Sequence, residues 1–147
     1  MDFIKEYKKG VIGEELAINY FKRKGWIVYD VRNEWFYRKK DIDFIIEMDN
    51  RRFSFEVKTQ KRINQKHEII VETCNLNLNK DGWFYYSECD YFLFVNPEER
   101  KGYIISAFSL KEYIENSNFE EQLNSYSNCL VYYLDLREMP IYQEINL

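Results

Sequence analysis

Two short apolar segments on either side of a polar turn constrain the fold of this chain more than any other feature. They cover residues 41–46 and 53–58, and an Asp-Asn pair lies in the middle of the residues between them. Alternating side chains around such a turn signal predict a β-hairpin. A turn centred on the Asp-Asn pair joins residues whose numbers add up to 99, so Asp43 is expected to face Glu56.

The same register places four charged side chains on one face of the hairpin. Asp41 faces Lys58 just as Asp43 faces Glu56, because side chains alternate along a strand. Directly opposed side chains have Cβ atoms about 4.5–5.5 Å apart. Two carboxylates at that distance repel each other unless a cation lies between them. The neighbouring side chains expected on the opposite face, in the core, are those of Ile42, Phe44, Phe55 and Val57.

Two carboxylates and a backbone carbonyl suit a hard divalent ion such as Mg²⁺ or Mn²⁺. Such an ion lowers the pKa of a bound water and offsets the charge of a phosphate. The predicted metal ligands are Asp43, Glu56 and the carbonyl of Val57. Lys58 can reach an attacking water or a phosphoryl oxygen from the same side of the strand. The alternative is a set of cross-strand ion pairs on a solvated face, with Asp41 and Lys58 as one such pair.

The rest of the chain predicts a mixed α/β (α+β) architecture. Helices are expected over residues 2–24 and 109–114, with Ser109 as the cap of the second one. Helices at both ends of a series of strands predict one domain over residues 1–147, with a central mixed sheet flanked by helices. Further strands are expected over residues 26–29, 68–73, 91–95, 102–105 and 130–134.

Composition excludes several classes of protein. No apolar stretch approaches the roughly 18 residues that a membrane span needs. The first residues lack the apolar core of a signal peptide, so a cytoplasmic protein without a membrane partner is expected. With 3 cysteines, no Cys-x-x-Cys pair and a single histidine, a zinc site is not expected.

Charge is distributed unevenly along the chain. The net charge is −4, which argues weakly against nucleic acid, but residues 32–66 carry ten basic and six acidic residues. Residues 67–147 carry five basic and fourteen acidic ones. The positive field therefore lies around one segment. The candidate contacts to a DNA backbone are Gln60, Lys61, Arg62 and Lys66. An exposed basic loop and a plain polar strand end are the alternatives.

Several parts of the sequence resemble the PD-(D/E)xK nuclease superfamily over about residues 11–95. Residues 13–17 are similar to the Gly-Glu-x-x-Ala start of bacterial relatives of Holliday junction resolvases. Residues 41–45 resemble their Glu-Ile-Asp-Leu-Ile strand, and residues 55–59 resemble their Glu-Val-Lys-Thr strand. The part between residues 70 and 91 is similar to phage-encoded nucleases of the superfamily, although Cys89 replaces an alanine there.

The resemblance implies a restriction-endonuclease-like core and a role for each matched residue. Asp43 and Glu56 match the metal ligands, and Lys58 matches the catalytic lysine. Glu14 matches the helix glutamate that leans on the metal site in such families. Helical periodicity alone does not choose between Glu14 and its neighbour Glu15.

The first functional hypothesis is an Mg²⁺- or Mn²⁺-dependent endodeoxyribonuclease in DNA repair, recombination or the biology of a mobile element. A homodimer is compatible with it, because duplex cleavage requires two sites and the 13 Tyr and 11 Phe could line an interface. The alternative is a nuclease fold without activity, an inhibitor or adaptor that binds through its acidic C-terminal face. An RNA-processing enzyme of the same fold is the third hypothesis.

Overall fold

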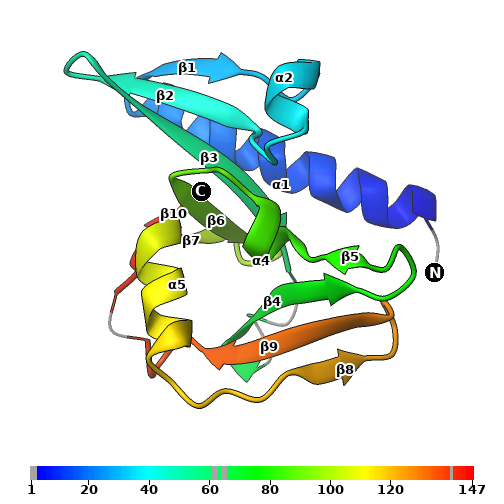
Figure 1. Ribbon diagram of the computed structural model, residues 1–147. Helices are drawn as coiled ribbons and strands as arrows, with labels where there is room; N and C mark the ends of the chain where they lie inside the picture. The colour runs from blue at the N-terminus through cyan, green and yellow to red at the C-terminus, as the bar shows by residue number, and fades with distance from the viewer. Residues whose placement is uncertain (1–2, 61–62, 64–65, 140) are drawn as a thin grey trace.

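A six-stranded mixed sheet forms the centre of the protein (Figure 1). The computed structural model describes residues 3–60, 63, 66–139 and 141–147. The strand order is β1-β2-β3-β6-β7-β10, and only the β3–β6 pair is parallel. The strands are β1 (Ile27–Asp30), β2 (Phe44–Met48), β3 (Arg51–Thr59), β6 (Tyr91–Asn96), β7 (Lys101–Ser106) and β10 (Gln143–Asn146).

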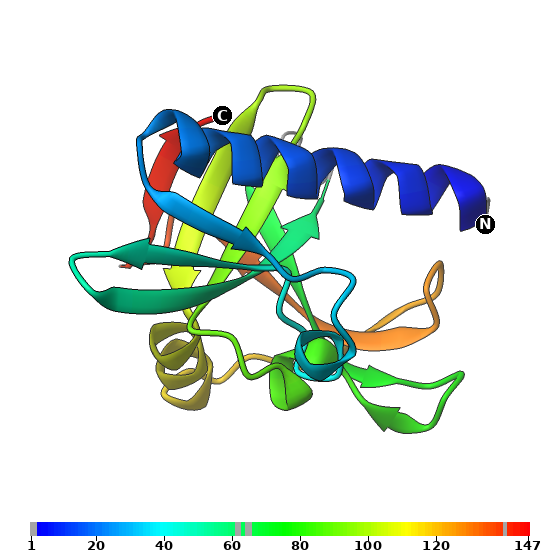
Figure 2. The same ribbon diagram turned by 90° about the horizontal axis from the view of Figure 1, so that it is seen from above.

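A second, four-stranded sheet lies on the opposite side of this sheet from α1 (Phe3–Arg23). Figure 2 shows α1 lying across the six-stranded sheet. The second sheet consists of β5 (Lys80–Asp81), β4 (Glu68–Asn75), β9 (Cys129–Asp135) and β8 (Gln122–Asn124), in that order. The shorter helices are α2 (Trp35–Arg38), α4 (Trp83–Tyr86) and α5 (Ala107–Glu115). Among the described helices, none is both long and apolar enough to cross a membrane.

Helix α1 packs on the sheet through an apolar face that includes Ala17, Ile18 and Phe21. The ring of Phe21 lies 5.6 Å from that of Phe44 and 5.1 Å from that of Phe55, measured between centroids. Aromatic contacts at such distances add to the stabilisation that burial provides. The C-terminal half of α1 is therefore fixed on β2 and β3, the two strands of the predicted hairpin.

A second apolar cluster fills the space between the two sheets. Phe92 and Phe94 of β6 meet Ile69 and Val71 of β4 there, and all four side chains are fully buried. The alternate residues of β6, such as Leu93, face α1. Burial on both faces explains why the sequence of β6 is an unbroken apolar run.

The hairpin has the predicted register, with Phe44 opposite Phe55. Strand β2 nevertheless begins at Phe44 and not at Asp41, because Asp41 has a φ of 58° and lies in a turn. The expectation that Ile42 shares a face with Phe44 was therefore wrong. Ile42 packs in the cluster between the sheets, and its N–H donates to the carbonyl of Tyr37 at 3.1 Å.

The mixed α+β class is confirmed, with differences in detail. The sheet is flanked by a long helix on one face only, because the second sheet, α4 and α5 together cover the other face. Strands β5, β8 and β10 and the short helices α2 and α4 were not expected. The cap of α5 is Ser106, whose Oγ accepts from the Ser109 N–H at 2.9 Å, so the expected Ser109 cap was wrong.

Candidate active site

Asp43 lies at the start of the hairpin, directly beside β3. Its N–H donates to the carbonyl of Phe55 at 2.9 Å, which extends the β2–β3 ladder by one residue. Its carboxylate Oδ2 accepts from the N–H of Val57 at 2.8 Å. This second hydrogen bond turns the Asp43 carboxylate along β3 and brings it next to Glu56.

Glu56 and Lys58 form an ion pair on the face of β3 that looks away from α1. Lys58 Nζ lies 3.0 Å from Glu56 Oε1 and 3.3 Å from Asp41 Oδ2. The hydroxyl of Ser87 donates to the same Asp41 oxygen. The Lys58 ammonium also lies 4.9 Å from the ring centroid of Trp83, which covers it. The structure thus brings Asp43, Glu56 and Lys58 together, and it adds Asp41 to them.

Burial dominates the electrostatics of these groups. Glu56 is only 7% exposed, and this burial raises its pKa well above the usual range, with Asp43 and Asp41 adding to the rise against the opposing effect of Lys58. Burial also raises the pKa of Asp43. For Lys58, burial lowers the pKa, but Glu56 and Asp41 raise it more, so the ammonium stays protonated. Three carboxylates therefore share one cation.

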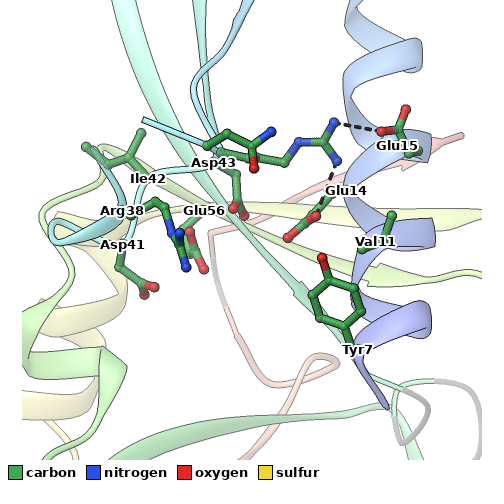
Figure 3. Close-up of a pocket in the computed structure, with 12 residues that line it drawn as sticks. Tyr7, Val11, Glu14, Glu15, Arg38, Asp41, Ile42, Asp43 and Glu56 are labelled. Atoms are coloured by element: carbon green, nitrogen blue, oxygen red, sulfur yellow. Dashed lines mark hydrogen bonds and ion pairs between the residues drawn. The ribbon is translucent and has the colours of Figure 1, made fainter. Parts of the chain in front are cut away.

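Helix α1 contributes a further carboxylate to this region. The pKa of Glu14 is raised by burial and by the carboxylate of Asp43. Figure 3 shows Glu14 between the helix and Asp43, while Glu15 lies further out. The structure therefore places Glu14, and not Glu15, beside the hairpin carboxylates.

Arg32 connects the helix to the loop that follows β1. Its guanidinium lies 3.3 Å from Glu14 Oε2, 2.6 Å from Glu15 Oε1 and 2.7 Å from Asp30 Oδ2. These contacts raise the pKa of Arg32, with the hydrogen bond to Asp30 as the largest cause. All its charge is thus used by neighbouring carboxylates, and it holds Glu14 in place.

Two hollows adjoin the site, and β3 contributes lining residues to both. The first has a volume of about 640 Å³ and is lined by Glu14, Arg38, Asp43 and Glu56 among others. The second, of about 620 Å³, is lined by residues including Lys58, Gln60 and Trp83. Gly10 of α1 borders both hollows. An extended ligand could therefore lie along α1 and pass the Glu56–Lys58 pair.

Of the four predicted DNA contacts, the structure describes Gln60 and Lys66. The side chain of Gln60 accepts from the N–H of Ile70 at 2.9 Å and donates to its carbonyl at 2.7 Å, so this amide joins β3 to β4. Lys66 is exposed. Lys61 and Arg62 lie outside the described residues. A phosphate contact from any of these four residues stays a prediction.

Several residues at the site were missed by sequence reasoning. Arg32 and Ser87 reach it across loops, and Trp83 reaches it from α4, so no local pattern marked them. The aromatic and basic run of residues 35–40 could have indicated Arg38, but the sequence prediction did not include it.

The donor set around Asp43 and Glu56 fits some divalent ions and not others. Among the described residues, no group of three or more His, Cys, Asp or Glu side chains converges in a way that could hold a metal. Asp43 and Glu56 supply two carboxylates, which fits Mg²⁺, an ion that takes one or two carboxylates and keeps several waters. The excess of carboxylates over cations around Glu56 also favours a bound cation. The set does not fit an ion that requires an all-protein cage.

Comparison with known proteins supports the fold. No protein family and no curated protein matches this chain. A solved structure of a bacterial homing endonuclease, I-Ssp6803I, matches with a TM-score of 0.51 and 15% sequence identity. The match covers 82% of this chain and 83% of the endonuclease chain. The two proteins therefore share a nuclease-like fold over most of their lengths.

Proposed function

We propose that this protein is a metal-dependent endonuclease that hydrolyses phosphodiester bonds in DNA. One observation carries the proposal: Asp43, directly before β2, meets Glu56 and Lys58 of β3, within a fold shared with a homing endonuclease. The sequence resemblance to PD-(D/E)xK nucleases assigns the same three residues. DNA repair, recombination or mobile-element biology is the proposed setting, and a homodimer would supply two sites for duplex cleavage.

The residues would divide the chemistry between them. Asp43, Glu56 and the Val57 carbonyl would hold Mg²⁺ or Mn²⁺, which activates water and offsets phosphate charge when bound. Lys58, kept protonated by the carboxylates of Glu56 and Asp41, places a positive charge where the phosphoryl oxygen develops negative charge. Glu14 faces Asp43 across the first hollow and supports the metal side of the site.

The test is cleavage of labelled duplex, single-stranded, flap and four-way DNA, with and without Mn²⁺. Cleavage should require the metal, and Lys58→Met should reduce it at least about 100-fold, the usual loss when one transition-state contact is removed. The circular dichroism spectrum should remain that of the folded protein, although loss of the cation beside buried Glu56 lowers its stability. Lys101→Met is the matched control, because Lys101 pairs only on the surface, with Glu144 at 2.8 Å. Cleavage that survives in Lys58→Met refutes the assignment.

A second candidate is a nuclease fold that binds without cutting, an inhibitor or adaptor. It is favoured by the absence of a three-ligand metal group among the described residues. A wild-type protein that cuts none of the DNA substrates and binds no Mn²⁺ would support it. RNA strands of the same sequences, added to the substrate panel, test the RNA-processing hypothesis.

A further inference from the structure

Helix α2 exposes two large aromatic side chains next to the candidate site. Trp35 is 74% exposed and Phe36 is 50% exposed. They begin the run Trp-Phe-Tyr-Arg-Lys-Lys at residues 35–40, in which three consecutive cations follow three rings. Neither ring belongs to the two apolar clusters, and aromatic side chains of this kind are enriched where partners bind.

The lysines of this run lie over its rings. Lys39 Nζ is 4.5 Å from the centroid of Trp35, and Lys40 Nζ is 4.2 Å from that of Phe36. Cation–π contacts are weak at exposed sites. A phosphate can therefore draw each ammonium away and leave a ring face free for another planar group.

The segment is anchored firmly beside the carboxylates. Tyr37 packs against the core cluster between the two sheets, and its carbonyl accepts from the N–H of Ile42. The carbonyl of Lys40 accepts from the N–H of Glu88 at 2.9 Å. Because both ends of the turn are held, the outer rings keep a fixed position relative to Asp43.

Arg38 points the other way, into the first hollow. It lines that hollow together with Asp41 and Glu56, and Figure 3 shows its guanidinium directed toward their carboxylates. Within the described part of the chain, no ion pair or side-chain hydrogen bond engages Arg38. This distinguishes it from Arg32, the other arginine of the hollow, which is occupied by three carboxylates.

We propose that residues 35–40 are the DNA-strand-binding element of this protein, and we call them the α2 platform. Trp35 and Phe36 stack on unpaired bases, and Lys39 and Lys40 contact the phosphates between them. Arg38 contacts the phosphate nearest the carboxylates. The role of Arg38 rests on the proposed nuclease function, whereas strand binding by the platform does not.

A single strand is the occupant that these features fit best. A polyanionic backbone matches three successive cations, because phosphate contacts supply most sequence-independent affinity. The rings need bases whose faces are free, which a paired duplex does not offer. The platform is therefore expected to prefer single-stranded DNA, or a junction with unpaired bases, over a continuous duplex.

Binding is tested by fluorescence anisotropy with a labelled single-stranded oligonucleotide. Lys58→Met serves as the parent protein, so that no cleavage interferes. Lys39→Ala/Lys40→Ala should reduce the slope of log affinity against log salt concentration by about 1.4, the value for two lost contacts to a single strand. The control is Lys22→Ala/Lys24→Ala, which also removes two cations, one of them 5.5 Å from the ring centroid of Tyr20. It should leave the slope unchanged.

The stacking part is tested separately with Trp35→Ala. Loss of one stacked base should weaken binding about 5- to 150-fold. Phe108→Ala, which removes another ring that is 75% exposed but belongs to α5, should leave affinity unchanged.

Four results would overturn the inference: no DNA binding by the parent, parent-like binding by both platform variants, tighter binding to duplex, or tighter binding to RNA of the same sequence. A protein that binds the strand through the platform but never cuts would refute only the proposed function. A protein that cuts while the platform variants bind normally would refute only this inference.

Discussion

Lys58 is shared between Glu56 and Asp41, at 3.0 and 3.3 Å, and this sharing decides how the site behaves without a metal. A buried carboxylate that lost its cation would be left uncompensated, which is costly in a protein interior. A divalent ion that binds Glu56 must therefore compete with Lys58. We expect the ammonium to swing toward Asp41 when the ion binds, which frees Glu56 and keeps Lys58 charged.

The pH dependence of stability tests the burial of Glu56. Folding raises the pKa of this carboxyl, chiefly through burial. Its contribution to stability is therefore complete below its unfolded pKa of about 4.3 and is lost as pH rises through the folded value. The free energy of unfolding of the wild type, minus that of Glu56→Gln, should fall as the pH rises above about 4.3.

Urea denaturation in the presence of EDTA measures this difference. Glu144→Gln, which alters an exposed glutamate paired with Lys101, should give a difference that is nearly constant over the same range. If the difference in the free energy of unfolding between the wild type and Glu56→Gln instead grows with pH, Glu56 is stabilised in its charged form.

At the residue scale, the sequence predicted those site residues whose relative positions are set by the hairpin itself. The register of the hairpin follows from its turn, so Asp43, Glu56 and Lys58 were correctly expected side by side. Ile42 was assigned to the wrong face, because alternation fails where Asp41 adopts a positive φ of 58°. Arg32 was not predicted, because its contacts join α1 to the loop after β1 and depend on the tertiary fold.

At the element scale, the close approach of α1 to β3 positions Glu14. A Cβ on Gly13 would overlap the Thr59 hydroxyl and lie 3.2 Å from Thr59 Cβ. Gly13 therefore lets the helix backbone approach the strand at the position just before Glu14. Gly10, one turn earlier, has no such role, because a Cβ there would meet nothing within 4 Å.

Gly13→Ala should therefore destabilise the fold by about 1–3 kcal/mol, the usual cost of overpacking. It should also reduce cleavage, because α1 and Glu14 move away from Asp43. Thermal denaturation and the DNA cleavage assay measure the two effects.

Two further variants show whether overlap with Thr59 causes the loss of stability in Gly13→Ala. Gly13→Ala/Thr59→Ala should recover much of the lost stability, since the overlapping atoms are removed. Gly10→Ala should be neutral or stabilise α1 by about 0.5–1 kcal/mol, because alanine favours the helix and the space is open. Equal damage from both glycine substitutions would exclude close packing at Gly13 as the cause.

The elements that the sequence predicted are those with a clear pattern of apolar residues along their own length. Helix α1, the hairpin and β6 each carry an amphipathic or continuous apolar pattern, and each lies close to its expected bounds. Strands β5, β8 and β10 are two to four residues long, too short for such a pattern. Strands β4 and β9 were expected, but their pairing joins residues far apart in the sequence, such as Glu68 and Asp135, which is why the second sheet was not expected.

At the scale of the whole molecule, the two sheets and α1 place one site between two hollows. Of the cations in residues 32–66, Arg32, Arg38 and Lys58 line the two hollows, so part of the positive segment of this acidic protein lies at the site. Positive charge there would attract a phosphate backbone, while the carboxylates need a divalent ion before that backbone can approach them. Metal and DNA binding are therefore expected to be coupled.

Calorimetric titration of the DNA-free protein with Mn²⁺ tests directly whether Asp43 and Glu56 hold a metal. The wild type should bind Mn²⁺, and Asp43→Asn should abolish this binding. Asp49→Asn, the same chemical change in the exposed turn of the same hairpin, should bind as the wild type does. A wild type that binds no Mn²⁺, or an Asp43→Asn protein that binds it unchanged, would contradict a metal site built on Asp43 and Glu56.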